Sequence, residues 1–453
     1  MRFSSFAEMI GHYAERTPDA PALRYAREGV MMTMTYGELR AKIREEIDYL
    51  RGLGVEAACH GFLLGDSVSP AELVGLFAAV EMGEQVVMLD ANTPVPILRG
   101  LLPYTDVDTI TADNELSKEL KPNLCQPKIK NGAGKVLFFT SGTTERSKAV
   151  VLTEKSLCSS AYNGGALLPL TERDTLLCML PLHHVFGFVC GLLWGLSCGA
   201  CVALGRGARH YLDDCDFFKP TAVSVVPMLL GFLLKQNLIN EEMKLVLVGA
   251  GDCPAALLQG ARARGLRVSF GYGLTETSSG VALSLGDDPY AMTVCPDDEI
   301  TIAPDGEILI KVRSCMMKGY YKCPEDTNAV LAGGVLHTGD LGRFDEKGRL
   351  HVTGRKKDML VLPDGTKLFL PEAEAELARL LGGADFALLL RGERVTLALY
   401  GDTRDDAAVF AAIEPYQGSR PRSQQVAAIA RQSEPLPRTA TGKVKRWELN
   451  TRL

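Results

Sequence analysis

The sequence has 453 residues, of which 46% are hydrophobic and 23% are charged, the balance of an ordinary soluble globular protein. Because a single hydrophobic core rarely grows past about 250–300 residues, we expect more than one domain. The formal net charge of -6 argues against broad nucleic-acid binding, which requires a basic face. The 12 cysteines are scattered and no secretory apolar segment follows Met1, so we expect reduced thiols and a cytoplasmic location.

The N-terminal region alternates helical and strand-like patterns. Residues 4–8 have the composition of a capped helix start, and residues 23–25 and 32–36 are typical of a β-hairpin. Apolar spacing predicts helices over residues 37–50 and 71–82. Short apolar runs predict buried strands at residues 85–89, 136–139, 176–179, 223–226 and 245–248. This alternation of strands with helices predicts largely parallel, buried sheets.

Residues 185–205 carry no charge, and glycine recurs at every fourth position from Gly187 to Gly199. This is the pattern of a membrane span with a small-residue face, and equally that of close packing inside a soluble core. The run is the only one of its kind in the sequence and contains the polar Ser197. We therefore expect no membrane span.

The pattern changes after about residue 300. Residues 307–312 are typical of an antiparallel strand, and residues 341–344 and 349–352 flank a hairpin turn. Such a hairpin brings Asp340, which precedes its first strand, beside Arg355, which follows its second. A charged run follows, and the remaining hundred or so residues have the α+β pattern of a small domain.

We therefore predict an α/β fold with two domains. The large N-terminal domain, residues 1–356, would combine βα-layered sheets with an antiparallel β subdomain. A hinge would join it to a small, mobile α+β domain, residues 357–453.

The loop between residues 139 and 149 is rich in small hydroxylated residues and ends in a lysine. Its hydroxyls and backbone N–H groups can bind an anion, with the lysine as a point charge. The spacing is not that of the familiar P-loop, and by itself the stretch fits a polar surface turn better. The candidate phosphate-binding residues are Thr140, Ser141, Gly142, Thr143, Thr144 and Lys148.

Four further stretches change that interpretation: residues 180–187, 271–276, 337–340 with 354–355, and 437–443. In this order along the chain, they resemble the adenylate-forming superfamily of acyl-CoA synthetases, adenylation domains and luciferases. Each motif alone is weak to moderate, but all of them in sequence order are highly specific. The resemblance covers nearly the whole chain. It implies that a carboxylate attacks the α-phosphorus of ATP, giving an acyl adenylate and pyrophosphate, and that a thiol then displaces AMP.

The first step brings an anion to a polyanion, so positive charge and a metal are needed. The resemblance implies that the loop from Ser141 to Lys148 holds the β- and γ-phosphates. It also implies that Glu276 binds Mg²⁺ and that Thr275 lies near the α-phosphate. Both residues would then be catalytic.

The resemblance also implies where the nucleoside is bound. Tyr272, between Gly271 and Gly273, would stack on adenine. Asp340 would accept hydrogen bonds from the ribose hydroxyls, with Arg355 beside it, in agreement with the edge deduced from the hairpin.

Two lysines have roles implied by the resemblance. In the family, the lysine at the position of Lys443 enters the site, bridges the attacking carboxylate and the phosphate, and leaves as the small domain swings. The flanking residues 437–439 and Arg446 favour this role over that of an exposed tail lysine. Lys357 matches the hinge position of the family, the alternative being an ordinary surface charge.

The phosphate loop departs from the family pattern. Relatives usually have glycine where Glu145 stands and proline at the position of Ser147. A carboxylate beside bound phosphates would repel them unless it faces solvent. A non-catalytic nucleotide-binding relative is therefore an alternative. The retained site residues argue against it, namely Thr275, Glu276, Asp340, Arg355 and Lys443.

The acid is constrained by the stretch around His184, which aligns with the aromatic or histidine gate beside the acyl pocket of the family. A buried, hydrogen-bonded histidine is the alternative. Amino-acid-activating relatives carry an aspartate in this neighbourhood, whereas residues 180–187 contain none, and an unpaired ammonium would be costly. Small residues at 249–251 and the helix after Gly187 suggest room for an alkyl chain. Residues 356–365 also resemble long-chain fatty acyl-CoA synthetases.

We therefore predict an ATP- and Mg²⁺-dependent acyl-CoA synthetase of fatty acid metabolism. Its substrates would be a small-molecule carboxylic acid, a medium- or long-chain fatty acid, together with ATP and coenzyme A. The phosphopantetheine of an acyl carrier protein is an alternative acceptor, which the sequence does not separate from coenzyme A. We expect no nucleic-acid partner.

Overall fold

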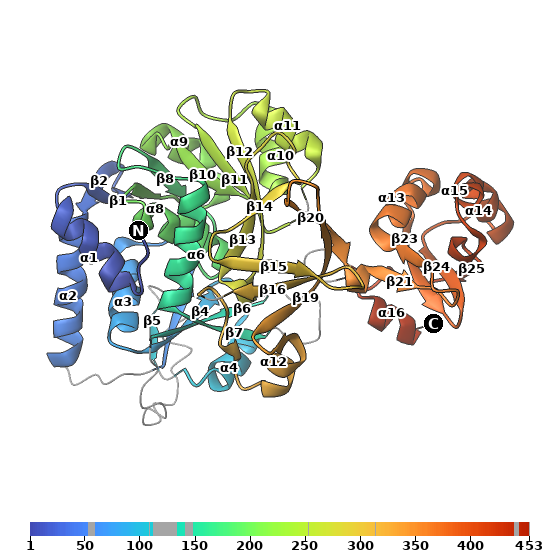
Figure 1. Cartoon of the computed structure of the whole chain (residues 1–453), viewed down its shortest axis with the longest axis horizontal. Coiled ribbons are helices and arrows are strands. Elements are labelled where there is room, and N and C mark those ends of the chain that lie inside the picture. Colours follow the sequence, from blue (N-terminus) through green and yellow to red (C-terminus); the bar gives the residue numbers. More distant parts are fainter. Residues whose placement is uncertain are drawn as a thin grey trace.

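The computed structural model describes residues 1–52, 59–107, 109–111, 134–140, 148–251, 253–312, 314–438 and 444–452 of the chain. Within these residues the strands form two large and two small sheets, and helices pack around the large ones (Figure 1). The elements that follow β20 (Leu350–Arg355) lie to one side of the rest.

The largest sheet has a parallel half. Its strands, in spatial order, are β11 (Leu245–Val248), β10 (Ala222–Val225), β8 (Thr175–Cys178), β9 (Cys201–Leu204) and β1 (Pro21–Arg27), with β2 (Val30–Thr35) antiparallel at the edge. Every residue of β8 to β11 is buried, as expected for parallel strands with elements packed on both faces. The predicted hairpin is confirmed as β1 and β2, although Tyr36 begins the next helix rather than ending the strand.

The same sheet continues as an antiparallel half beyond β12 (Arg267–Leu274), which is parallel to β11. Its strands, in spatial order, are β13 (Ser279–Ser284), β14 (Met292–Val294), β20, β19 (Val335–Phe344), β16 (Glu307–Val312) and β15 (Asp298–Ile302), and β18 (Leu331–Ala332) also pairs with β19. This half is the predicted antiparallel region, and β19 and β20 form the predicted hairpin.

The second large sheet carries the ends of the predicted phosphate loop. Its strands, in spatial order, are β5 (Thr109–Thr111), β3 (Cys59–Leu64), β4 (Gln85–Asp90), β6 (Lys135–Phe139), β7 (Ala149–Thr153) and β17 (Gly319–Tyr320). The first four are parallel, whereas β7 and β17 are antiparallel to their neighbours. Strand β17 therefore brings a distant part of the chain beside β7.

The helices begin where the sequence signals predict. Ser5 accepts a hydrogen bond from the Glu8 N–H at the start of the first helix, and Ser69 forms a reciprocal capping box at the third. The helices of the large region are α1 (Phe6–Arg16), α2 (Tyr36–Gly52), α3 (Pro70–Glu81), α4 (Val95–Tyr104), α6 (Glu154–Leu167), α9 (Tyr211–Phe218), α10 (Pro227–Gln236), α11 (Ala255–Arg262) and α12 (Pro324–Val330). Helices α1, α2, α3 and α6 contribute buried residues to one large core.

The glycine-rich run forms a continuous helical segment made of α7 (Val185–Phe188), the π-helical turn η1 (Val189–Leu193) and α8 (Trp194–Ser197). A Cβ at Gly187 would lie 2.2 Å from the carbonyl oxygen of Pro181, and one at Gly195 would lie 2.8 Å from Cγ2 of Val202. These glycines therefore serve close packing against neighbouring elements. In the described part of the chain, no helix combines the length and apolarity that crossing a membrane requires.

The C-terminal elements have a core of their own, whose buried residues lie between Leu362 and Val426. These elements are β21 (Met359–Val361), β22 (Lys367–Phe369), α13 (Leu370–Leu381), β23 (Asp385–Arg391), β24 (Arg394–Tyr400), α14 (Asp406–Ala412), α15 (Glu414–Ser419), β25 (Ala428–Arg431) and α16 (Arg446–Arg452). The α/β fold class is confirmed. The division at residues 356 and 357 stays a prediction.

Two contacts join the C-terminal elements to the rest beside the short turn η4 (Lys356–Asp358). A Cβ at Gly354 would lie 2.3 Å from Cε2 of Phe369, so the absence of a side chain lets this ring pack against β20. The Lys367 ammonium donates to the carbonyl oxygen of Asp305 at 3.4 Å. Gly354 lies three residues before the predicted hinge at Lys357, and Lys367 and Phe369 lie ten and twelve residues after it.

Candidate active site

A carboxylate and a guanidinium meet at the end of the β19–β20 hairpin. Asp340 and Arg355 are direct partners in the register, which confirms the neighbours predicted from the sequence. Arg355 Nε lies 2.9 Å from Asp340 Oδ1, and the Tyr272 hydroxyl donates to Asp340 Oδ2 at 2.9 Å. Side chains from β12, β19 and β20 therefore meet at one place on the sheet.

The Asp340 carboxylate is almost fully buried, with 2% of the residue exposed. Burial raises the pKa of Asp340, and the charges of Arg355 and Lys357 with the hydrogen bond from Tyr272 offset this only in part. Each carboxylate oxygen has two lone pairs, so each can accept a second hydrogen bond. The arrangement can therefore bind two neighbouring hydroxyl groups, such as those of a ribose.

The glycines on either side of Tyr272 are required by the backbone. A Cβ at Gly273 would lie 1.9 Å from the carbonyl oxygen of Ser279, and one at Gly271 would lie 3.1 Å from Cδ2 of Leu283. The pairing of β12 with β13 also shifts register between Tyr272 and Gly273. The two glycines thus allow the close strand approach that positions the tyrosine.

Glu276 lies in the tight turn η3 (Thr275–Thr277), directly after β12. The next two residues, Ser278 and Ser279, have φ angles of 56° and 111°, which strain the backbone of residues with a side chain. The Met317 N–H holds the turn by donating to the Glu276 carbonyl at 2.8 Å. A strained turn that is fixed by its surroundings is common where a side chain must be held in one place.

Glu276 and Lys148 both contact Tyr320, one at its hydroxyl and the other at its ring. The Tyr320 hydroxyl donates to Glu276 Oε1 at 2.7 Å, and the Lys148 ammonium lies 4.8 Å from the centre of the Tyr320 ring. Lys148 Nζ is also 2.9 Å from Oδ1 of Asp326, on α12. Burial and the charge of Glu276 both raise the pKa of Tyr320, so its hydroxyl stays a hydrogen-bond donor.

Thr140 and Lys148, the two ends of the predicted phosphate loop that the structure describes, are hydrogen-bonded to each other. The Thr140 N–H donates to the Lys148 carbonyl at 3.0 Å, and the Lys148 N–H donates to Thr140 Oγ1 at 3.3 Å. The remaining loop residues of the prediction lie outside the described residues, as does the predicted catalytic lysine: Ser141, Gly142, Thr143, Thr144, Glu145, Ser147 and Lys443.

His184 precedes α7 with an exposed side chain, and its ring centre lies 4.4 Å from that of His183. Partial desolvation by the surrounding chain and the neighbouring His183 lower the pKa of His184 to about 4. The ring is therefore neutral at physiological pH. Within the described residues, His184 forms no hydrogen bond or ion pair with Glu276 or Asp340, and its gate role stays a prediction.

Of the small residues predicted to leave room for an alkyl chain, Gly249 is buried, whereas Ala250 and Gly251 are exposed. A Cβ at Gly249 would lie 2.8 Å from the Phe186 ring. A narrow apolar cavity of about 20 Å³ lies nearby in the fold, lined among others by Trp194, Leu247 and Leu283. A space of this size holds a water molecule rather than an alkyl chain.

Among the described residues, no group of three or more His, Cys, Asp or Glu side chains could hold a metal ion. Mg²⁺ is usually held by only one or two carboxylates, with substrate phosphates and water completing its shell. A single carboxylate such as Glu276, fixed by Tyr320, which also lies beside Lys148, fits this kind of site.

Sequence reasoning missed Tyr320 and Asp326. Tyr320 belongs to a Lys-Gly-Tyr-Tyr run, residues 318–321, whose aromatic pair is a weak signal by itself, and Asp326 follows this run. Their relevance comes from the pairing of β17 with β7, in which Tyr320 lies opposite Val150. No pattern in the sequence predicts this pairing of distant strands.

The fold matches solved structures over nearly the whole chain. The O-succinylbenzoate coenzyme A synthetase from Bacillus subtilis, solved in complex with ATP and magnesium ion, has a TM-score of 0.77 at 23% identity, covering 98% of this chain and 99% of that chain. ATP-bound MatB from Rhodopseudomonas palustris has a TM-score of 0.78 at 21% identity, covering 100% and 99%. The chain therefore shares the fold of these two structures.

Comparison with protein sequences narrows the class. Residues 107–321 match the family described as AMP-binding enzyme. A 3-[(3aS,4S,7aS)-7a-methyl-1,5-dioxo-octahydro-1H-inden-4-yl]propanoyl:CoA ligase from Mycobacterium tuberculosis is 30% identical over 69% of this chain and 65% of its own length. A 2-succinylbenzoate–CoA ligase from Bacillus subtilis is 29% identical over 80% of both chains, and a long-chain-fatty-acid–CoA ligase from Mycobacterium tuberculosis is 23% identical over 95% of both. The chain thus matches an AMP-binding enzyme model over residues 107–321 and spans 65% of the length of the first of these relatives, and all three relatives are CoA ligases.

Proposed function

We propose that this protein is an ATP-dependent, AMP-forming acyl-CoA ligase. It would join a carboxylic acid to the α-phosphate of ATP with release of pyrophosphate, and then transfer the acyl group to the thiol of coenzyme A with release of AMP. The observation that carries the proposal is the edge formed by Tyr272, Asp340 and Arg355, with Glu276 on the turn directly after β12. This arrangement suits a ribose at one end and phosphates with their metal at the other.

The residues would divide the work according to charge. Asp340 would hold the ribose hydroxyls, with Arg355 offsetting its buried charge. Glu276 would bind Mg²⁺, which when present offsets the charge of the phosphates. Tyr320 would keep the Glu276 carboxylate in position. Lys148 would contact the β- and γ-phosphates. Ion pairs with these phosphates would then replace its ion pair with Asp326.

The part of the site that binds the apolar body of the acid would need side chains without charge. His184, neutral because its pKa is lowered to about 4, could border the acid without adding a cation. Thr275, which begins the turn η3, would lie at the α-phosphate. Lys443 would supply the positive charge between the attacking carboxylate and that phosphate. A cytoplasmic location stays a prediction from the sequence.

For the acid itself we propose a medium- or long-chain fatty acid. The relative that aligns over 95% of both chains is a long-chain-fatty-acid–CoA ligase, which supports this choice together with residues 356–365. An aromatic acid is the second candidate, because the 2-succinylbenzoate–CoA ligase has the higher identity of 29%.

The first prediction compares acids in ATP–pyrophosphate exchange. We expect kcat/KM to rise about fourfold per methylene from acetate through octanoate to dodecanoate, because each buried CH₂ contributes about 0.8 kcal/mol. 2-Succinylbenzoate and phenylalanine complete the panel. Equal rates with acetate and dodecanoate would rule out an alkyl-binding pocket, and a preference for 2-succinylbenzoate would select the aromatic candidate.

The same panel separates the remaining alternatives when the thiol is varied. Thioester formation with coenzyme A but not with a phosphopantetheinylated carrier protein is the expected result. The reverse preference would identify an acyl-AMP ligase that loads a carrier. Nucleotide binding without exchange for any acid would identify a non-catalytic relative.

The second prediction concerns Tyr320. Tyr320→Phe removes the hydroxyl that donates to Glu276 while keeping the ring beside Lys148. A hydrogen bond to a charged group contributes roughly 1.5–3 kcal/mol, so we expect exchange activity to fall at least about tenfold. We also expect a higher Mg²⁺ concentration for half-maximal exchange, because the carboxylate is less well oriented.

Tyr321→Phe is the matched control. The Tyr321 hydroxyl makes the same kind of bond, at 2.7 Å, to the carboxylate of Asp106. This variant should lose comparable stability and keep the Mg²⁺ dependence of the wild type. If both variants change exchange activity and Mg²⁺ dependence equally, Tyr320 has no special relation to the metal-binding carboxylate.

A further inference from the structure

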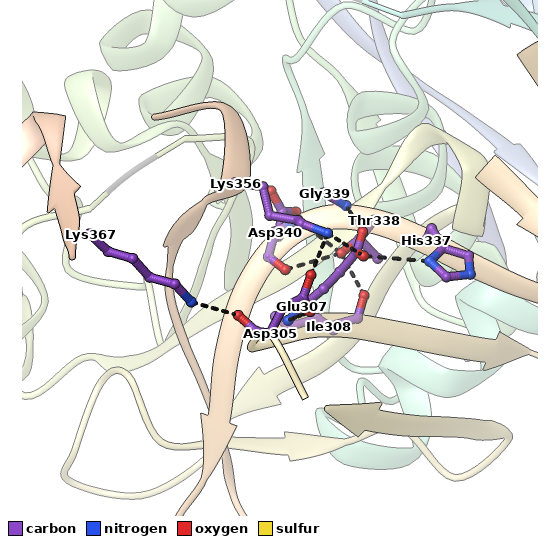
Figure 2. Close-up of polar contacts among 9 residues, drawn as sticks. All are labelled: Asp305, Glu307, Ile308, His337, Thr338, Gly339, Asp340, Lys356 and Lys367. Carbon is purple, nitrogen blue, oxygen red and sulfur yellow. Dashed lines mark hydrogen bonds and ion pairs between the residues drawn. The ribbon is translucent and has the colours of Figure 1, made fainter. Parts of the chain in front are cut away.

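One nearly buried carboxylate contacts both the proposed ribose-binding turn and the predicted hinge. Glu307, at the start of β16, has 8% of its side chain exposed. Its Oε1 accepts a hydrogen bond from the Gly339 N–H at 2.8 Å, and its Oε2 lies 2.9 Å from the Lys356 ammonium. Figure 2 shows Glu307 between these two partners. Gly339 directly precedes Asp340, and Lys356 directly precedes Lys357.

Residues 338–340 make a local turn of the backbone within β19 that presents Asp340, and this turn is held to β16 by its own contacts. The Thr338 hydroxyl donates to the Ile308 carbonyl at 2.7 Å and accepts from the Asp340 N–H at 3.0 Å (Figure 2). Gly339 has a φ of 69°, in the region that favours glycine. Glu307 and Ile308 thus hold successive residues of this turn, so the position of Asp340 depends on β16.

The charge of Glu307 is stabilised from several directions. Burial by itself would raise the pKa of Glu307, but hydrogen bonds from Lys356, Gly339 and His337 lower it. The His337 Nδ1 lies 3.4 Å from Oε2. Lys356 in turn reaches Asp305 Oδ2 at 2.7 Å, and the carbonyl of Asp305 accepts from Lys367 of the C-terminal elements. The carboxylate is therefore ionised and central to a network that crosses the junction.

We propose that Glu307 is a positioning residue that links the nucleotide site to the hinge, by tying the turn of Asp340 to Lys356. The inference rests on the proposed function, because it treats Asp340 as a ribose contact. The ion pair with Lys356 holds the last residue before the predicted pivot against β16. Rotation about Lys357 then leaves Lys356 and the ribose-binding turn in place.

The test is a thermodynamic cycle on the affinity for ATP, measured by calorimetry. Glu307→Gln keeps an acceptor for the Gly339 N–H but loses the ion pair, and Lys356→Met loses the same ion pair from the other side together with the exposed one to Asp305. We expect each to raise the Kd for ATP about fivefold, and the double variant to raise it about fivefold as well rather than about 25-fold. Glu307→Ala should have a larger effect, about thirtyfold, because Gly339 then also loses its acceptor.

Controls separate this role from general destabilisation. Lys311→Met and Glu299→Gln break an exposed ion pair of 3.7 Å between the neighbouring strands β15 and β16, and they should leave the Kd unchanged. Lys356→Arg keeps the positive charge and should therefore bind ATP as tightly as the wild type. If Glu307 variants fail to fold, Lys356→Met and Lys356→Arg still decide the matter, with thermal unfolding as a check.

The outcomes distinguish this inference from the proposed function. A wild-type protein that binds no ATP overturns the proposed function and the inference with it. Normal ATP binding by the wild type with an unchanged Kd in Lys356→Met overturns the inference alone. A double variant whose effect equals the product of the single effects also overturns it, because the two residues then act independently.

Discussion

Replacing Lys443 by alanine is expected to slow formation of the acyl adenylate by about 10²–10³-fold, the scale of losing one preorganised electrostatic group. The proposed role of this lysine is to offset charge between the attacking carboxylate and the α-phosphate, which is needed only in the first half-reaction. The variant should therefore still convert synthetic acyl-AMP and coenzyme A to the thioester at a nearly normal rate. Single-turnover measurements of each half-reaction test this directly.

Lys357→Pro should have the opposite pattern, because proline restricts φ at the proposed pivot. Pyrophosphate exchange should persist, whereas thioester formation should slow.

Lys445→Ala is the matched control for Lys443, since Lys445 is a nearby lysine that pairs with Glu448 at 3.5 Å. It should leave both halves unchanged. If Lys443→Ala or Lys357→Pro impairs the two halves equally, an alternating-domain mechanism does not apply to this chain.

Replacing Asp340 by asparagine is expected to lower kcat/KM for ATP about 100-fold. The carboxylate accepts from the Tyr272 hydroxyl and pairs with Arg355, and each oxygen can accept a second hydrogen bond from the ribose. Charge-assisted hydrogen bonds contribute roughly 1.5–3 kcal/mol each, so weakening two of them accounts for this loss. Steady-state kinetics with varied ATP, together with calorimetric binding of AMP, measure the effect.

Asp345→Asn controls for the loss of an aspartate from the same hairpin. Asp345 accepts from Arg349 Nε at 2.8 Å and from the backbone N–H of Lys347 at 2.9 Å, in the turn between β19 and β20. This variant should lower the unfolding temperature but leave the affinity for AMP unchanged. A loss of affinity in both variants would mean that Asp340 acts through hairpin stability rather than through contact with the nucleotide.

Local patterns determined much of the fold and the most compact part of the site. Short apolar runs predicted the central strands, and the strand–turn–strand pattern from 341 to 352 predicted the hairpin. The pairing of Asp340 with Arg355 followed from it, because the register of a hairpin depends on residues close together in the sequence. Motifs in sequence order also identified the superfamily. The roles of residues 141–147 and of Lys443 remain predictions, since these residues lie outside the described part of the chain.

Only the tertiary structure decided which distant groups support these residues. The bond from Tyr320 to Glu276 depends on the pairing of β17 with β7, and the contacts of Glu307 depend on where β16 meets β19. The glycine run illustrates the same limit, since its spacing suits close packing as well as a membrane span. The atoms facing Gly187 and Gly195 decided for close packing. Sequence patterns report the neighbours of a residue along a helix or strand, whereas contacts between elements arise from how whole surfaces pack together.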